Sequence, residues 1–77
     1  MVRLTGLEGA LDHMIASIEK ELGAPLAEMS REKKQQAVGI LESRGAFRMR
    51  KSIDEVADRM QVSRITVYNY LNTVNKT

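Results

Sequence analysis

The side chains best suited to contact a nucleic acid lie in one short stretch, VSRITVYNYL at residues 62–71. Arg64 can form paired hydrogen bonds with guanine or hold a phosphate, and Asn69 can form paired hydrogen bonds with adenine. Ser63 places a hydroxyl at a predicted helix start, where free backbone N–H groups attract a phosphate. An aliphatic group suits a thymine methyl, and a phenol suits a phosphate oxygen. The candidate DNA contacts in this stretch are Ser63, Arg64, Ile65, Thr66, Tyr68 and Asn69.

A second basic group lies in AFRMRK at residues 46–51. Phe47 and Met49 alternate with Arg48 and Arg50, so two apolar groups can face inward while two guanidinium groups face out. The pattern favours a short extended loop, and a packed turn with solvated charges is the alternative. The candidate phosphate contacts here are Arg48, Arg50 and Lys51.

Few residues are suited to catalysis or to holding a metal ion. The chain has no Cys, and His13 is its only His, with no nucleophile or second ligand near it in sequence. Asp54, Glu55 and Asp58 cluster, but the helix dipole explains acidic side chains at a predicted helix N-terminus. The sequence has no Gly-rich phosphate loop and too few aromatic residues to stack on RNA bases. We therefore expect no metal, no cofactor and no enzymatic activity.

Charge divides the 77 residues into an acidic and a basic part. Residues 1–29 hold two basic against five acidic side chains, a net charge of −3, whereas residues 30–77 hold ten against five, a net charge of +5. Seven of the basic side chains lie between Arg31 and Lys51. This asymmetry favours an acidic partner for the second part. No apolar run reaches membrane-spanning length and no signal-peptide pattern is present, so we expect a cytoplasmic protein with no membrane partner.

The N-terminal segment is predicted to form an amphipathic helix from about Leu4 to Leu22. Its apolar residues recur at helical spacing, in a stripe wider than a coiled-coil seam. Such a helix either dimerises the chain or belongs to an ordinary core, and the spacing alone does not decide between them. The candidate dimerisation residues are Leu4, Leu7, Leu11, Met14, Ile15, Ile18 and Leu22.

The segment GAPLAEM, residues 23–29, ends this helix, because Gly is a natural C-terminal cap and Pro disfavours helix at the residue before it. We expect two domains: a connector or dimerisation helix at 1–28 and a DNA-binding domain at 29–77. The second helix is predicted to begin after the N-cap Ser30 and to end at Gly45.

Two short helices follow, separated by a turn of two or three residues. Ser52 and Glu55 predict a capping box at the start of the third helix, and Ser63 predicts an N-cap for a fourth helix at about 64–72. These proportions are typical of a helix-turn-helix. Gln61 stands at a turn position that usually holds Gly, because the backbone φ tends to be positive there.

The apolar residues of these helices predict a core made almost entirely of aliphatic side chains. This composition favours an all-α fold, a small bundle of four helices that contains a helix-turn-helix and an N-terminal amphipathic helix. The expected core residues are Ala37, Val38, Ile40, Leu41, Val56, Ala57, Met60, Val67, Tyr70 and Leu71, with Val62 pinning the turn.

Residues 29–72 resemble the C-terminal helix-turn-helix domain of DauR/YheO-like bacterial transcriptional regulators. The resemblance rests on MSREKK (29–34), GAF (45–47), the pair Val56-Ala57 and VSRITVYNYL (62–71). The family has Gly where Gln61 stands and commonly an aliphatic residue where Arg48 stands.

This resemblance implies a transcription factor that binds double-stranded DNA, with an N-terminal PAS-like sensor domain. Segment 1–28 is too short to form that sensor, so we expect either a C-terminal fragment or a short stand-alone relative. Segment 1–28 corresponds to the connector that often mediates self-association, which predicts a homodimer on a two-fold DNA site. The alternative is a protein-interaction module that uses the N-terminal apolar stripe.

Overall fold

The computed structural model describes residues 6–49 and 51–75, which form four α-helices and two short 3-10 helices. No strand occurs within those ranges, so the predicted all-α fold is confirmed. Leu4 and Arg50 lie outside the described residues, as does the side chain of Leu7. The elements are α1 (Gly6–Leu22), η1 (Leu26–Glu28), α2 (Arg31–Ser43), η2 (Ala46–Arg48), α3 (Ser52–Met60) and α4 (Arg64–Asn75).

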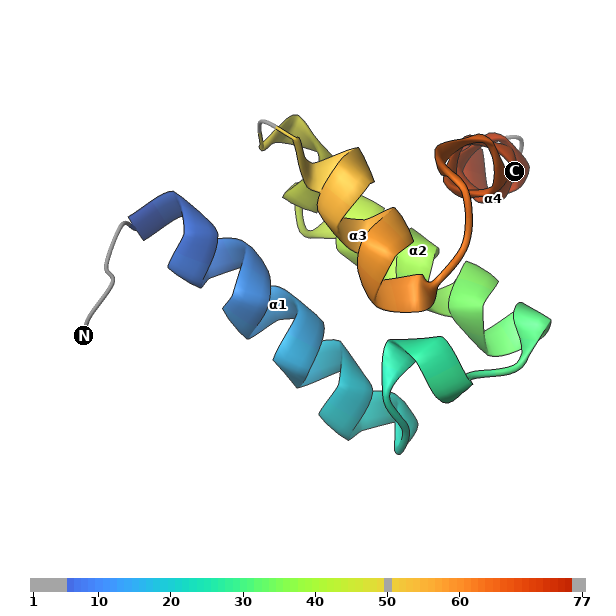
Figure 1. The fold of residues 1–77 in the computed structure, drawn as a ribbon, viewed down its shortest axis with the longest axis horizontal. Coiled ribbons are helices and arrows are strands. Elements are labelled where there is room, and N and C mark those ends of the chain that lie inside the picture. Colours follow the sequence, from blue (N-terminus) through green and yellow to red (C-terminus); the bar gives the residue numbers. More distant parts are fainter. Residues whose placement is uncertain (1–5, 50, 76–77) are drawn as a thin grey trace.

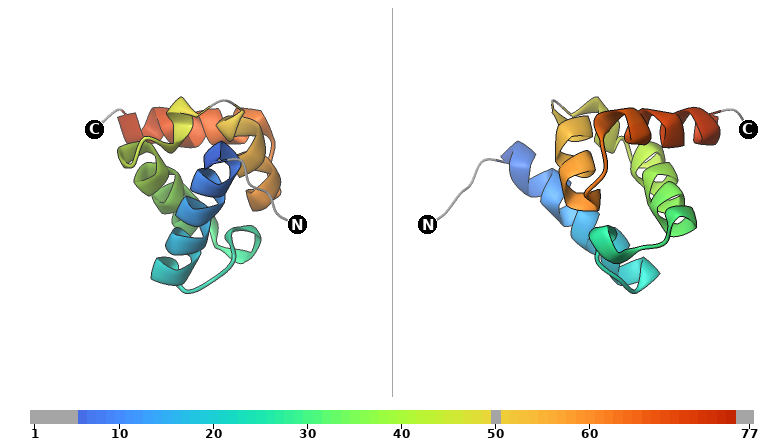
Figure 2. Two further views of the ribbon diagram at one scale, coloured as in Figure 1. Left: turned by 90° about the vertical axis from the view of Figure 1, so that its left-hand side faces the viewer. Right: turned by 45° about the vertical axis from the view of Figure 1, so that its right-hand side comes forward.

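Helix α2 lies at the centre of the arrangement. It packs against α1 on one side and against α4 on the other, while α3 packs against α4 and η1 (Figure 1). Helix α4 lies at one end of the molecule, and the turn from α1 into η1 lies at the other end (Figure 2). Within the described ranges, no other element covers one side of α4.

One core joins all the helices, including α1. The predicted core residues of α2 and α3 are buried, except that Ile40 is half-buried and packs on the core from its edge. The α1 residues buried in it are Leu11, Ile15 and Ile18, with Leu26 and Met29 from the segment that follows. Burying an aliphatic side chain of this size contributes about 1.5–3 kcal/mol, so α1 supplies a large share of the stability of this small core.

The stripe expected to dimerise the chain is therefore partly occupied within one chain. Leu11, Ile15 and Ile18 are at most 7% exposed, and Met14 and Leu22 pack against the same core while staying half-buried. The domain boundary expected near residue 28 separates two segments that share this core.

Ion pairs also connect α1 to the helices that follow it. Arg59 Nη2 on α3 lies 2.7 Å from Asp12 Oδ1 on α1, and its Nε lies 3.3 Å from Glu55 Oε2. Arg44 Nη2, just after α2, lies 2.8 Å from Glu21 Oε2, and this hydrogen bond lowers the pKa of the Glu21 carboxyl. Such exposed pairs contribute little to stability, so their main effect here is to orient α1.

The start of α2 and the ends of α1 and α2 follow the local sequence as predicted. The Ser30 hydroxyl accepts a hydrogen bond from the backbone N–H of Lys33 at 3.2 Å, which caps α2. Gly23 and Gly45 follow α1 and α2 with φ of 82° and 81°, a left-handed conformation that Gly adopts without strain.

The segment after Gly45 turns sooner than an extended loop would. Ala46–Arg48 form the 3-10 helix η2, with Ala46 fully buried and Arg48 exposed. The expected extended loop is therefore wrong, because the left-handed Gly45 redirects the chain at once and brings Ala46 into the core. Phe47 and Met49 pack against the core as expected, so the packed-turn alternative describes this segment.

The expected capping box of α3 is also wrong. Ser52 is the first residue of the helix, and the preceding Lys51 takes the N-cap place with a left-handed φ of 62°. The Ser52 hydroxyl is buried and has no hydrogen-bond partner among the described residues. The backbone N–H of Glu55 bonds to the Lys51 carbonyl at 3.1 Å, and the Glu55 side chain pairs with Arg59 instead of reaching back.

Replacing Ser52 with Ala should raise the free energy of unfolding by about 1 kcal/mol, because it removes a buried hydroxyl that lacks a partner. Ser30→Ala is the matched variant and should lower that free energy by about 1 kcal/mol, because it removes a working cap. Urea unfolding followed by circular dichroism measures both. If Ser52→Ala costs as much stability as Ser30→Ala, the Ser52 hydroxyl is a working cap after all.

Candidate nucleic-acid interface

A left-handed turn joins α3 to α4. The backbone N–H of Val62 bonds to the Ala57 carbonyl at 3.0 Å, and that of Gln61 bonds to the Asp58 carbonyl at 3.1 Å. This pair of hydrogen bonds is a Schellman motif, which requires a left-handed residue just past the helix end. Gln61 is that residue, with φ 59° and ψ 44°, as its place in the turn predicted. Val62 packs against the core and holds the turn to it.

Ser63 caps the start of α4, as predicted. Its hydroxyl accepts a hydrogen bond from the backbone N–H of Thr66 at 3.1 Å, and it lies 3.0 Å from the Thr66 hydroxyl. The Ser63 hydroxyl therefore bonds to the Thr66 hydroxyl as well as to the backbone N–H of Thr66. Each hydroxyl keeps only part of its hydrogen-bonding capacity for a ligand.

Helix α4 has one buried and one exposed side. Val67 is fully buried, Tyr70 is 8% exposed and Leu71 packs at the edge, which confirms the predicted inward face. The helix runs to Asn75, three residues further than expected, because its last turn rests on α2. The exposed side carries the predicted contacts Arg64, Ile65, Tyr68 and Asn69, together with Asn72, whereas the predicted contact Thr66 is half-buried.

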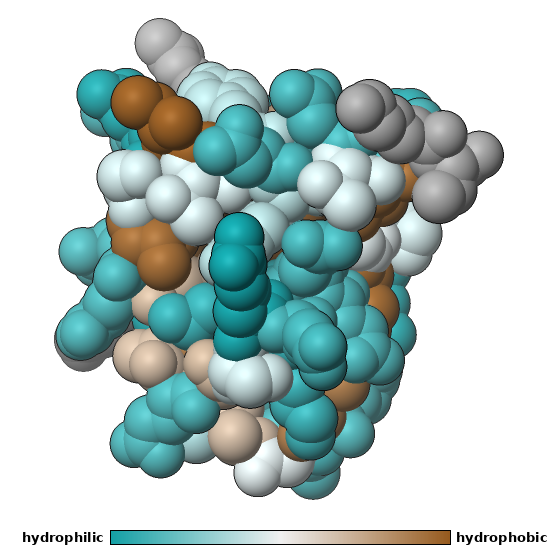
Figure 3. All heavy atoms as spheres, turned by 90° about the vertical axis from the view of Figure 1, so that its right-hand side faces the viewer, coloured by the Kyte–Doolittle hydropathy of each residue, from teal (hydrophilic) through white to brown (hydrophobic). Residues whose placement is uncertain are grey.

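Two large apolar side chains stand out on this exposed side. Ile65 is 71% exposed and Tyr68 is 54% exposed, and no other large hydrophobic residue in the described chain is as open to solvent. The surface that carries α4 is otherwise mostly hydrophilic, and its hydrophobic side chains lie apart from one another (Figure 3). The two residues therefore belong to a mixed polar and apolar surface on α4 and not to a broad apolar patch.

A shallow groove lies where η2, α3 and α4 meet. Its lining is polar at Lys51, Ser52, Asp54, Arg64 and Tyr68 and apolar at Phe47, Met49 and Ile53. Arg64 Nη1 lies 3.3 Å from Asp54 Oδ1, in an ion pair whose side chains are 67% and 54% exposed. We call this the α3–α4 groove.

The fold thus brings together residues that are distant in sequence. Lys51, Arg64 and Tyr68, all predicted contacts, share the α3–α4 groove, with Arg48 exposed on η2. The sequence prediction missed the pairing of Asp54 with Arg64, because it assigned the three acidic residues of α3 to the helix dipole alone.

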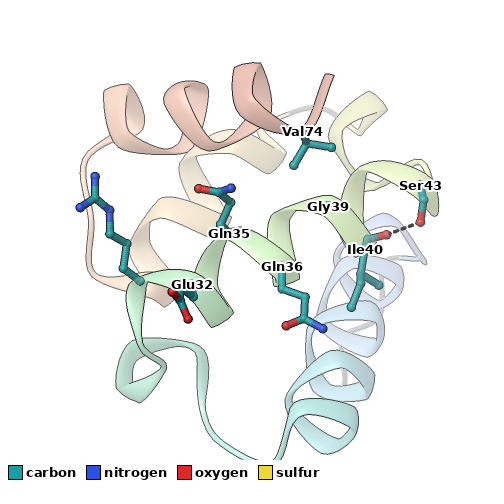
Figure 4. A pocket seen from close by; sticks show the side chains of 8 residues that line it. Glu32, Gln35, Gln36, Gly39, Ile40, Ser43 and Val74 are labelled. Carbon is teal, nitrogen blue, oxygen red and sulfur yellow. Dashed lines mark hydrogen bonds between the residues drawn. The ribbon is translucent and has the colours of Figure 1, made fainter. Parts of the chain in front are cut away.

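A larger open hollow lies on another part of the surface, between α2 and the end of α4 (Figure 4). Gln35, Gln36, Ile40 and Ser43 line it, and none of the predicted contacts does. Gly39 lies opposite Val74 here, where an added Cβ would meet the valine at 3.5 Å. The only signal in the sequence was a Gly inside a helical pattern, which indicates close packing.

Within the described part of the chain, no group of three or more His, Asp or Glu side chains is arranged to hold a metal ion. None of the described helices is long and apolar enough to cross a membrane.

Comparison with known proteins agrees with the geometry of α3, the turn and α4. A family model described as an HTH domain matches residues 10–72, which include α3, the turn and most of α1 and α4. No curated protein and no solved structure matches the chain. The family match covers α1 from residue 10, the part of that helix that enters the shared core.

Replacing Gln61 with Gly should raise the free energy of unfolding by up to about 1 kcal/mol, because Gly adopts the left-handed conformation without steric cost. Part of the gain is offset by the greater freedom of Gly in the unfolded chain. Gln61→Ala is the control, since it removes the side chain but keeps the strain. Thermal unfolding compares the two variants, and equal effects would show that the turn stores no backbone strain.

Proposed function

The chain belongs to the family of helix-turn-helix domains, and from that premise we propose that it is the DNA-binding domain of a bacterial transcriptional regulator. Helix α4 enters the major groove of double-stranded DNA. The observation that carries this proposal is the exposed side of α4, where Ile65 and Tyr68 stand open to solvent beside Arg64 and Asn69. Aliphatic, aromatic, guanidinium and carboxamide groups on one helix face suit base edges and the adjoining phosphates.

Base contacts fall to the groups that protrude from α4. In the proposed complex Arg64 bonds to guanine, Asn69 bonds to adenine, and Ile65 contacts a thymine methyl. The Thr66 methyl is a second candidate for contact with a thymine methyl, although the Thr66 hydroxyl bonds to Ser63. These contacts would supply sequence specificity.

Phosphate contacts fall to the groups around the α3–α4 groove. Lys51 and Tyr68 line it, and Arg48 lies exposed on η2. Arg50 is proposed as a phosphate contact on the basis of the sequence alone. Ser63 is proposed as another, because it lies at the N-terminus of α4. These contacts would hold the domain on the duplex whatever its sequence, and the net charge of +5 on residues 30–77 would draw it there.

The proposed assembly is a homodimer on a two-fold DNA site, with the two α4 helices about 34 Å apart. Because Leu11, Ile15 and Ile18 lie in the core, the contact between copies would use the rest of the α1 stripe, including Met14 and Leu22. The resemblance to DauR/YheO-like regulators adds the further proposal that a sensor domain works with this module in a cytoplasmic protein.

Fluorescence anisotropy with a labelled duplex of unrelated sequence tests DNA binding. The logarithm of the association constant should fall linearly with the logarithm of salt concentration, by about 0.9 for each phosphate neutralised. Arg48→Ala should reduce that slope by about 0.9, because it removes one phosphate contact. No binding at low salt would contradict the proposed function.

Lys20→Ala is the matched control, since it removes one positive charge from an exposed position on α1. That end of α1 lies away from α4 in both views (Figure 2). The control should leave the slope unchanged. Equal slopes for the two variants would mean that only net charge matters and that Arg48 touches no phosphate.

The dimer is tested separately by sedimentation equilibrium of the full chain, alone and with a duplex. Two chains per particle are expected, at least on DNA. A single chain in both samples would rule out the homodimer and leave the DNA-binding proposal standing.

A further inference from the structure

The ion pair between Asp54 and Arg64 places a negative charge on the surface that is proposed to face DNA. Asp54 lies in the first turn of α3, and Arg64 is the first residue of α4. Asp54 is the one carboxylate among the described residues that line the α3–α4 groove. A carboxylate beside phosphate-binding groups weakens DNA attachment, so its position needs a reason.

Helix capping alone does not account for this carboxylate. Acidic residues favour helix N-termini, and Glu55 supplies a second acidic side chain in the same turn. Glu55, however, pairs with Arg59 on its own helix, whereas Asp54 reaches across the turn to α4. Asp54 is thus the acidic residue of α3 that acts on the proposed recognition helix.

We propose that Asp54 is a specificity-determining residue that directs Arg64 toward a base and away from the phosphate backbone. This inference rests on the proposed DNA-binding function. Arg64 carries five N–H donors, and the Asp54 contact involves its Nη1 atom. The remaining donors can bond to the neutral acceptors of guanine while the ion pair stays in place.

A phosphate contact by Arg64 has the opposite relation to Asp54. It would bring a second negative charge close to the carboxylate, and the two anions would compete for one guanidinium. Both side chains are more than half exposed, so the ion pair is weak. Neutralising the carboxylate would remove this pair and the competition, and would leave Arg64 free to contact a phosphate. Asp54 therefore lowers the affinity for random DNA, where Arg64 can contact only a phosphate, more than the affinity for a site that places a guanine opposite Arg64.

The test uses two duplexes, a random one and one selected from a random pool by the wild-type chain. Asp54→Asn should strengthen binding to the random duplex by roughly three- to tenfold at low salt, as expected for removing a charge within a Debye length of a phosphate. Its salt slope should steepen by about 0.9, because Arg64 gains a phosphate contact. Binding to the selected duplex should change less, so the ratio of the two affinities should fall.

Asp58→Asn is the matched control, because Asp58 is an exposed carboxylate one turn further along α3 and does not line the groove. It should leave both the slope and the affinity ratio unchanged. In an Arg64→Ala background, Asp54→Asn should no longer alter the slope. Asp54→Ala, which also removes the charge, repeats the measurement independently of the amide.

The inference is overturned if Asp54→Asn and Asp58→Asn act alike, which would be an effect of net charge. It is also overturned if Asp54→Asn weakens both duplexes equally, which would mean that Asp54 only holds the helix in place. In either case the wild-type chain still binds DNA and the proposed function survives. If the wild-type chain binds neither duplex at low salt, both proposals fail.

Discussion

The direction in which α4 leaves α3 depends on one left-handed residue. Gln61 can close the Schellman motif only with positive φ, and that conformation sets the angle between the two helices. Val62 and Val67 then lie against the core, one on each side of the capping residue Ser63. The exposure of the opposite side of α4 follows from this geometry. The strain at Gln61 is tolerated because the buried residues on either side fix the turn.

Helix α1 makes this small arrangement stable. A domain of this size has little interior, and the two helices of the motif with α2 would leave a core open on one side. Ile15 and Ile18 close that side, and the ion pair between Asp12 and Arg59 ties α1 to α3. The α1 stripe therefore has a role inside the chain whether or not it also contacts a second copy. A dimer contact through α1 would have to use the apolar residues that are not buried in the core. The area of that contact would be small unless residues outside the α1 stripe also took part.

How much the sequence predicted depends on the range of the interactions involved. The caps at Ser30 and Ser63 were predictable because each hydroxyl bonds to a backbone group three residues away. Ser52 has the same local pattern, but its position is set by the burial of Ala46 and by the left-handed Lys51, which no local rule includes. Tertiary packing overrode capping there.

The α1 stripe and the Asp54–Arg64 pair show the same limit. An apolar stripe at helical spacing suits a core and a dimer contact equally, so only the fold could assign Ile15 and Ile18 to the core. The exposure of Arg64, Ile65, Tyr68 and Asn69 was predictable because these residues fall on the side of α4 opposite Val67. The pairing of Asp54 with Arg64 was not, since the two residues are ten positions apart and meet only when the turn closes.

In the proposed complex, the hydrogen bonds at the start of α4 limit which side chains would be free to discriminate between bases. The Ser63 and Thr66 hydroxyls bond to each other, and the Ser63 hydroxyl also caps the helix, so both side chains are held in place and are less free to adapt to a base. Asn69 and Ile65 are exposed, and Arg64 is bound only through an exposed ion pair. In the proposed complex, specificity would then depend on limiting what each of these side chains can contact. The Asp54 carboxylate beside Arg64 would limit the contacts of that guanidinium.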